Sequence, residues 1–206
     1  MNSITYFLRV AIVVLVSCLS GCAFGRTTSY LGASNFVVDV KSPKKTVVVM
    51  HDQRDYVLSN NKGSHFVGLM RSLMGIPYNL STSTGNPLAN DFGSLVRDTL
   101  LKNGLDVRQE IISPFQSRAD FLSGNTMNVN ERLVFITLSE WKTDLHVNGR
   151  LFYELNLEVY DASKKLLGSS TESGTKMLSG SYDLSTAVTE IFNNLFAKPQ
   201  IKFAMT

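Results

Sequence analysis

Alternation of apolar and polar residues over residues 151–160 constrains the fold more than any other feature of this sequence. The apolar set is Leu151, Tyr153, Leu155, Leu157 and Val159, and the residues between them are Phe152, Glu154, Asn156, Glu158 and Tyr160. This period of two predicts a strand with one face on a core. Asn148-Gly149, directly before it, is typical of a two-residue hairpin turn. We therefore expect an antiparallel meander, with a long strand at 132–146 and a more polar strand near an edge at 165–177.

A helix is expected between Asn86 and Gly104. Asn86 is a favourable N-cap residue, and Pro87 at the first helical position has no N–H to lose. Asn103-Gly104 is a typical helix end. The apolar residues between these ends recur at helical spacing and form one face: Leu88, Phe92, Leu95, Val96, Thr99 and Leu100.

A second helix is expected to begin at Asp183 and to end at Lys198-Pro199. Its apolar face comprises Leu184, Ala187, Val188, Ile191, Phe192 and Leu195. The remaining segments are predicted as strands at 36–40, 46–50 and 105–111, a short helix at 114–122, and a hairpin or ordered loop at 56–84.

These elements predict an α/β domain of the α+β type. The expected architecture is a two-layer sandwich, in which a mostly antiparallel sheet carries two main helices on one face. Residues 36–206 are long enough to form one domain with a core of its own.

The amino terminus has the pattern of a secretory signal. Arg9 precedes a short apolar run at 10–16, which is too short to span a bilayer. The quartet Leu19-Ser20-Gly21-Cys22 then resembles the lipobox of bacterial lipoproteins. The resemblance implies that residues 1–21 are removed and that Cys22 is acylated. The residues that follow are mostly small and polar, which predicts a tether at 22–35. An ordinary signal peptide or an uncleaved anchor are the alternatives.

Charge and cysteine content limit the classes of function. The only other cysteine is Cys18, so the processed chain would hold no disulfide, and its stability must come from packing. The formal net charge is only +3, and no run of Lys or Arg exceeds two residues, which argues against a nucleic-acid partner. Ala23 follows Cys22 where an aspartate would favour inner-membrane retention, so we expect the outer membrane.

The order of elements resembles that of YajG-like outer-membrane lipoproteins. The likeness rests on the lipobox, a Val-rich strand ending in Asp52-Gln53-Arg54, a helix closing at 102–104, a meander and a carboxy-terminal helix. It spans most of the processed chain in layout. It implies a lipid-anchored envelope protein without an assigned reaction.

No pattern predicts catalysis or a cofactor. His51, His65 and His146 are scattered and form no zinc motif. Gly168-Ser169-Ser170 lacks the pattern of a nucleophile elbow, and no Gly-rich phosphate loop is present. The sequence therefore predicts neither an enzyme nor a metal site.

Three features are candidates for binding. The charged turn His51, Asp52, Arg54 and Asp55 could bind a polar ligand, or Arg54 could pair with Asp52 or Asp55 to fix a solvated turn. Trp141 could mark an interface or lie in the core.

The third candidate is the apolar patch at 66–78, which includes Met70 and Ile76. It could face a partner or a membrane, or it could cover the core as a lid. The leading hypothesis is a lipid-anchored interaction module with an envelope protein partner. A small-ligand or lipid-binding lipoprotein is the alternative, and an envelope hydrolase built around His51 is the third.

Overall fold

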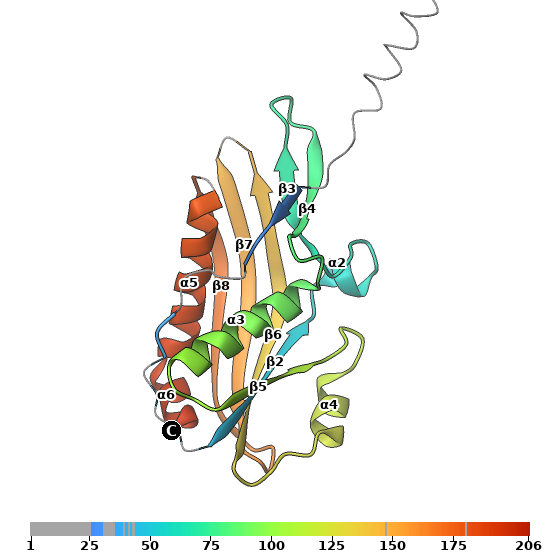
Figure 1. The fold of residues 1–206 in the computed structure, drawn as a ribbon. Helices are drawn as coiled ribbons and strands as arrows, with labels where there is room; N and C mark the ends of the chain where they lie inside the picture. Colours follow the sequence, from blue (N-terminus) through green and yellow to red (C-terminus); the bar gives the residue numbers. More distant parts are fainter. Residues whose placement is uncertain are drawn as a thin grey trace, which may run out of the picture.

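The computed structural model describes residues 26–30, 36–38, 40, 42, 44–146, 148–179 and 181–206, with only the backbone at 181–183. Within these residues, eight strands form one sheet (Figure 1). The strands are β1 (Arg26–Thr28), β2 (Lys45–Asp52), β3 (Phe66–Arg71), β4 (Pro77–Thr82), β5 (Val107–Ile111), β6 (Glu131–Leu145), β7 (Gly149–Tyr160) and β8 (Leu166–Leu178). The helices are α2 (Asp55–Leu58), α3 (Leu88–Lys102), α4 (Arg118–Gly124), α5 (Ser181–Ala197) and α6 (Pro199–Met205).

Strand β6 is the centre of the sheet. It pairs antiparallel with β7 along one side, and β7 pairs antiparallel with β8, so the predicted meander is confirmed. On its other side, β6 pairs parallel first with β2 and then, near its end, with β3. Strand β5 continues the sheet beyond β2, whereas β4 and β1 continue it beyond β3.

The predicted mostly antiparallel sheet is wrong. The sheet is mixed, because β1–β4, β2–β5, β2–β6 and β3–β6 are parallel pairs, and only β3–β4, β6–β7 and β7–β8 are antiparallel. The long crossovers from β2 to β5 and β6 allow parallel pairing, which a tight turn does not. Periodicity within a strand does not reveal the direction of its neighbour.

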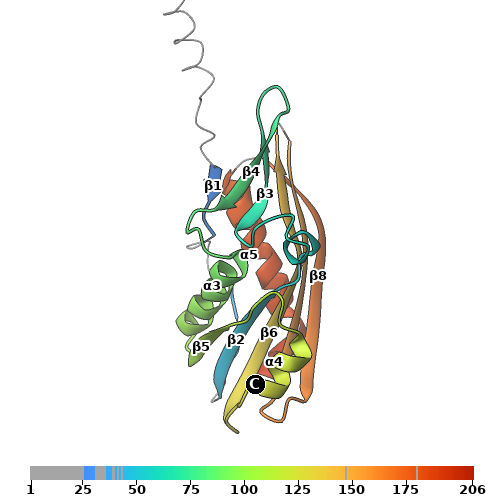
Figure 2. The same cartoon turned by 90° about the vertical axis from the view of Figure 1, so that its right-hand side faces the viewer.

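The two-layer arrangement is also wrong, because helices cover both faces of the sheet. On one face, side chains from α3, α5 and α6 pack in one core with Val48 and Val134. On the other face, Phe121 from α4 packs with Val47 and Phe135 in a second core. Figure 2 shows α4 set apart from α3 and α5. Two-sided burial explains why seven consecutive residues of β2 are buried.

The two main predicted helices are confirmed as α3 and α5. The second ends at Ala197, close to the predicted Lys198-Pro199 stop. Pro199 then opens the additional helix α6, because proline is tolerated in the first turn. Ile201, Ala204 and Met205 of α6 extend the larger core. Within the described residues, no helix is long and apolar enough to cross a bilayer.

The chain joins the fold soon after the predicted lipobox. Arg26–Thr28, inside the segment expected as a tether, forms β1 and pairs parallel with β4. Tyr30 is 1% exposed and belongs to the larger core. Phe36 is equally buried and stacks on Phe192 and Phe196, although the described residues of 36–40 form no strand. The tether interpretation is therefore wrong for residues 26–30, whereas the signal peptide and Cys22 lie outside the described residues.

Candidate functional site

The charged turn after β2 is built around a buried ion pair. Arg54 donates from Nε to Asp52 Oδ1 at 2.8 Å and from Nη2 to Asp52 Oδ2 at 2.7 Å. The two side chains are 0% and 1% exposed. Arg54 also donates to the carbonyl oxygens of Phe66 at 2.6 Å and Ser64 at 2.9 Å. The pair therefore fastens the end of β2 to the start of β3.

The other residues of this turn do not converge on a ligand site. His51 is 2% exposed, and its Nε2 lies 2.8 Å from Nε2 of Gln53, which also donates to the carbonyl oxygen of Pro114. Burial lowers the pKa of His51, although nearby backbone groups and Asp52 oppose the shift. Asp55 is exposed at the start of α2. The structure therefore favours the interpretation in which an ion pair of Arg54 fixes the turn over the polar-ligand site. Asp52 is the partner of Arg54, and the pair is buried rather than solvated.

Trp141 lies in the core. Its side chain is fully buried, and Nε1 donates to the hydroxyl of Tyr30 at 3.1 Å. The indole also makes edge contacts with the rings of Tyr30 and Phe92. Trp141 therefore joins β6 to the amino-terminal segment and to α3, and it is not available as an interface residue.

The apolar patch at 66–78 is divided between core and surface. Phe66 and Val67 at the start of β3 are 4% and 0% exposed. Met70 is half-buried, and its sulfur accepts a hydrogen bond from Arg26 Nη1 at 2.7 Å. Beyond it, Ile76 is 52% exposed. The base of the hairpin thus packs on the core, and its far end does not.

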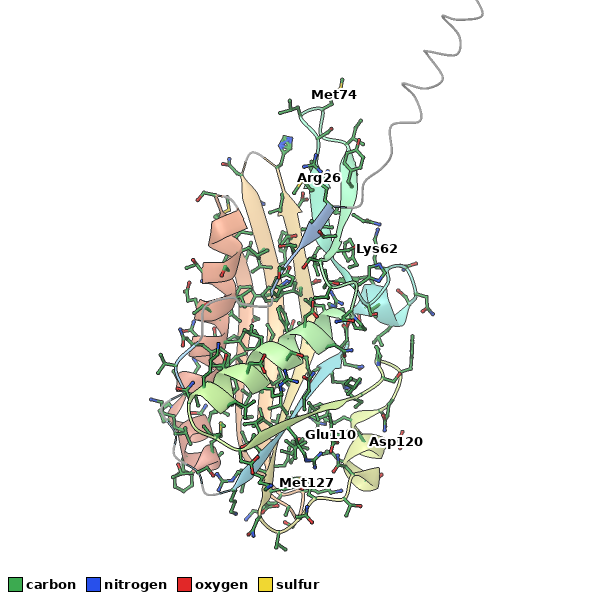
Figure 3. All side chains as sticks on the ribbon, viewed as in Figure 1. Arg26, Lys62, Met74, Glu110, Asp120 and Met127 are labelled. Carbon is green, nitrogen blue, oxygen red and sulfur yellow. The ribbon has the colours of Figure 1, made fainter. Side chains whose placement is uncertain are left out.

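The far end of this hairpin carries exposed apolar side chains. We call Leu73, Met74, Ile76 and Tyr78 the hairpin tip; they are 99%, 89%, 52% and 42% exposed. Among the described residues, Met74 lies at the far end of the domain, and Arg26 lies below it at the same end (Figure 3). The candidate residues Met70 and Ile76 therefore belong to one hairpin, whereas the charged turn lies beside its base.

Two surface hollows lie away from residues 66–78. The first, of about 440 Å³, is beside edge strand β5 and α4 and is lined by Glu110, Ile111, Gln116, Phe121, Gly124, Asn125 and Thr126. The second, of about 310 Å³, lies between β8 and α5. Among the described residues, no group of three or more His, Cys, Asp or Glu is placed to hold a metal ion.

Sequence reasoning missed two features of the surface. The apolar run at 66–78 was visible, but the separation of buried Phe66 from exposed Leu73 and Met74 depends on where the core ends. Ile111 was expected only as part of a strand, yet it is 71% exposed on β5. No local pattern shows that β5 would be an edge strand, because its only pairing, with β2, joins segments far apart in the chain.

Sequence comparison identifies no relative: no family model matches the chain, and a comparison with curated proteins gives no match. The fold is similar to that of XCC0632 from Xanthomonas campestris, of family DUF330. The TM-score is 0.51 at 12% identity, over 87% of this chain and 95% of that chain. At this identity the likeness shows the fold alone.

Two further solved structures are less similar to this chain. The PelC dodecamer from Paraburkholderia phytofirmans has a TM-score of 0.41 at 16% identity, over 80% of this chain and 95% of that chain. Lipoprotein GNA1162 from Neisseria meningitidis has a TM-score of 0.34 at 16% identity, over 76% and 100% of the two chains. Neither likeness is strong enough to bear on function, and the resemblance to YajG-like lipoproteins stays a prediction.

Proposed function

We propose that this chain is a lipid-anchored bacterial envelope protein that acts through non-covalent contacts and catalyses no reaction. Its lipid is attached to Cys22 after removal of residues 1–21, and its domain faces the periplasm from the outer membrane. The supporting observation is the path of the chain after this cysteine. Strand β1 begins at Arg26, four residues later, and Tyr30 already lies in the core. A lipid on Cys22 would therefore hold the folded domain directly at the membrane.

The non-catalytic role is supported by the charged turn. Its ionisable side chains are the densest such group in the sequence, and the structure uses them in contacts within the fold. Asp52 and Arg54 neutralise one another, and His51 is buried beside Gln53. The alternative, a small-ligand or lipid-binding lipoprotein, requires an apolar cavity beside residues 66–78. The two hollows described above lie elsewhere, so they give that alternative no support.

Replacing Cys22 with serine tests the anchor. We expect the Cys22→Ser protein to lose label from radioactive palmitate and to move from the membrane fraction to the soluble fraction. The physical reason is that each buried methylene contributes about 0.8 kcal/mol to membrane binding, and two acyl chains hold firmly. Cys18→Ser is the matched control, because it changes the chain's other cysteine, and it should keep both label and membrane fraction. A labelled, membrane-bound Cys22→Ser protein would refute the anchor.

We place the contact with an envelope protein at β5. Among the described strands, β5 ends one branch of the sheet and pairs with β2 alone, so its outer side is open to another chain. Ile111 is 71% exposed, and Phe115, four residues later in the chain, is 66% exposed. The hollow next to β5 gives room for alternate side chains of an added extended segment, which is a known mode of peptide recognition.

Site-specific photocrosslinking in cells tests this surface. A photoreactive residue at Ile111 is expected to give one discrete protein adduct, identified by mass spectrometry, that disappears in the Cys22→Ser background. The matched control is Leu166, an exposed apolar residue at 47% on β8, which ends a different branch of the sheet. An adduct at Leu166 with none at Ile111 would show that the contact surface is wrongly placed.

A further inference from the structure

We propose that the hairpin tip enters the interfacial layer of the same bilayer that holds the lipid of Cys22. The domain would then contact the membrane at two points, the lipid and the tip, and its orientation would be fixed. This inference rests on the proposed anchoring at Cys22. It assigns a lipid surface as the ligand of the hairpin tip, whose side chains are exposed and do not pack in the core.

The exposure of the tip is built into an ordered turn. Gly75 donates its N–H to the carbonyl oxygen of Ser72 at 2.9 Å, and Ser72 donates to the carbonyl oxygen of Ile76 at 2.9 Å. Gly75 has a φ of +80°, which glycine adopts without steric cost. This hydrogen-bonded turn leaves Leu73 and Met74 pointing into solvent. Single exposed apolar residues are ordinary on a protein surface, but four of them within six residues form a candidate contact site.

The start of the domain lies at the same end of the molecule as the tip. Strand β1 runs parallel to β4, and Arg26 is paired with Leu80. Pro77, where β4 begins, is three residues closer to the tip, a distance of about 10 Å along a strand. Figures 1 and 2 both show β1 beside the base of this hairpin, with the tip beyond it.

The length of chain between Arg26 and Cys22 is similar to the distance of about 10 Å that separates the level of Arg26 from Pro77. Four residues of chain span at most about 14 Å, because extended chain covers no more than about 3.3–3.6 Å per residue. A lipid on Cys22 would therefore lie no further from the domain than about the level of the tip. When the lipid is in the bilayer, the tip is brought to the membrane surface with it.

A bilayer fits the tip better than a protein partner does. A stable protein interface buries about 800 Å² on each side, which one narrow turn does not supply. A lipid surface needs no shape complementarity, and Leu, Met and Tyr are suited to its boundary with water. Arg26 and Arg150 are exposed at this end of the sheet, where anionic headgroups would attract them.

Tryptophan fluorescence on vesicles tests the inference without relying on acylation in cells. The chain from Cys22 onward holds every described element and no second cysteine, so its thiol can be coupled to a maleimide lipid. The vesicles contain phosphatidylethanolamine and phosphatidylglycerol brominated in the upper acyl chain. The variant is Met74→Trp. The native Trp141 is fully buried and supplies a constant background.

The matched control is Val129→Trp. Val129 is 83% exposed and apolar like the tip, but it lies just before β6 begins, at the other end of the sheet. Figure 3 shows its neighbour Met127 far from Met74. An interfacial side chain lies about 5–10 Å into the boundary, so we expect bromines to reduce the added emission of Met74→Trp about twofold. The emission of Val129→Trp should not change.

The outcomes separate this inference from the proposed function. Quenching of Met74→Trp but not of Val129→Trp would support insertion of the tip. Equal emission from Met74→Trp on brominated and ordinary vesicles would overturn it, even if Cys22 is acylated in cells, and would leave the tip for a protein partner. Conversely, quenching on coupled vesicles together with an unaltered Cys22→Ser protein in cells would overturn the anchor and not the membrane affinity of the tip.

Discussion

Replacing Asp52 with alanine is expected to lower the free energy of unfolding by about 3–5 kcal/mol, because it leaves a buried guanidinium without its carboxylate. The side chains of Arg54 and Asp52 are 0% and 1% exposed, so water cannot replace the lost partner cheaply. Denaturant titration followed by circular dichroism measures the change. The result would establish that the charged turn serves stability.

Asp144→Ala is the matched control for this prediction. Asp144 also accepts two hydrogen bonds from an arginine, Arg71, each at 2.7 Å, but the two side chains are 29% and 34% exposed. Exposed pairs contribute only about 0.2–1 kcal/mol, so the loss should be several times smaller. Equal losses in Asp52→Ala and Asp144→Ala would contradict the argument from burial.

A double variant identifies the origin of the loss. Asp52→Leu combined with Arg54→Met removes both charges, and such replacements of a buried pair are often neutral. We expect it to be more stable than Asp52→Ala, though not fully restored, since Arg54 also binds the carbonyl oxygens of Ser64 and Phe66. A double variant less stable than Asp52→Ala would show that these backbone contacts outweigh the cost of the unpaired charge.

Replacing Tyr30 with alanine is expected to lower the free energy of unfolding by about 3–5 kcal/mol, as for other aromatic truncations in a core. The ring of Tyr30 makes edge contacts with Phe92 at 5.1 Å and with Trp141 at 5.9 Å between centroids. The effect bears directly on the membrane inference, because it measures whether the segment after the lipobox is part of the domain.

Two further tyrosine variants refine this measurement by denaturant titration. Tyr30→Phe keeps the ring but removes the acceptor of the Trp141 N–H, and an unsatisfied buried donor costs about 1–3 kcal/mol. Tyr78→Ala truncates a tyrosine that is 42% exposed and should change stability by only about 0.5 kcal/mol. If Tyr30→Ala were as mild as Tyr78→Ala, the anchor would be joined to the domain by a longer tether. The expected orientation at the membrane would then lose its basis.

The two proposed contacts have different consequences for the protein in the envelope. The hairpin tip lies at the end of the sheet where β1 begins, whereas β5 lies nearer α4, away from that end (Figure 1). Ile111 of β5 lines the hollow that α4 also lines. A domain held by Cys22 and the tip would therefore direct β5 away from the lipid surface. This orientation is what an anchored protein needs in order to bind a second envelope protein.

Local sequence patterns determined several elements correctly. The period of two at 151–160 corresponds to β7, and the helical spacing from Leu88 to Leu100 corresponds to α3. These patterns succeed because each reports one buried face of one element, which depends on neighbours within a few residues. The lipobox at Cys22 is likewise a local pattern, and the Cys22→Ser experiment tests the lipid that it predicts.

The pairing of the strands was decided by tertiary structure. Val47, Val48 and Val49 interrupt any alternation, which indicates burial on both faces, but nothing in them shows that β5 and β6 are the parallel neighbours. The same holds at the candidate site, where the sequence left both Asp52 and Asp55 as partners for Arg54. The structure chose Asp52, which places the ion pair inside the fold.

The sequence by itself determined the apolar faces of α3 and β7 and the existence of the two main helices, α3 and α5. Only the tertiary structure decided what each face meets, because those contacts join residues far apart in the chain. Tyr30 and Trp141 are separated by 111 positions, and no local pattern in either segment specifies the other. Leu73 and Met74 illustrate the converse: their apolarity was visible, but their exposure follows from a hairpin that extends past the edge of the core.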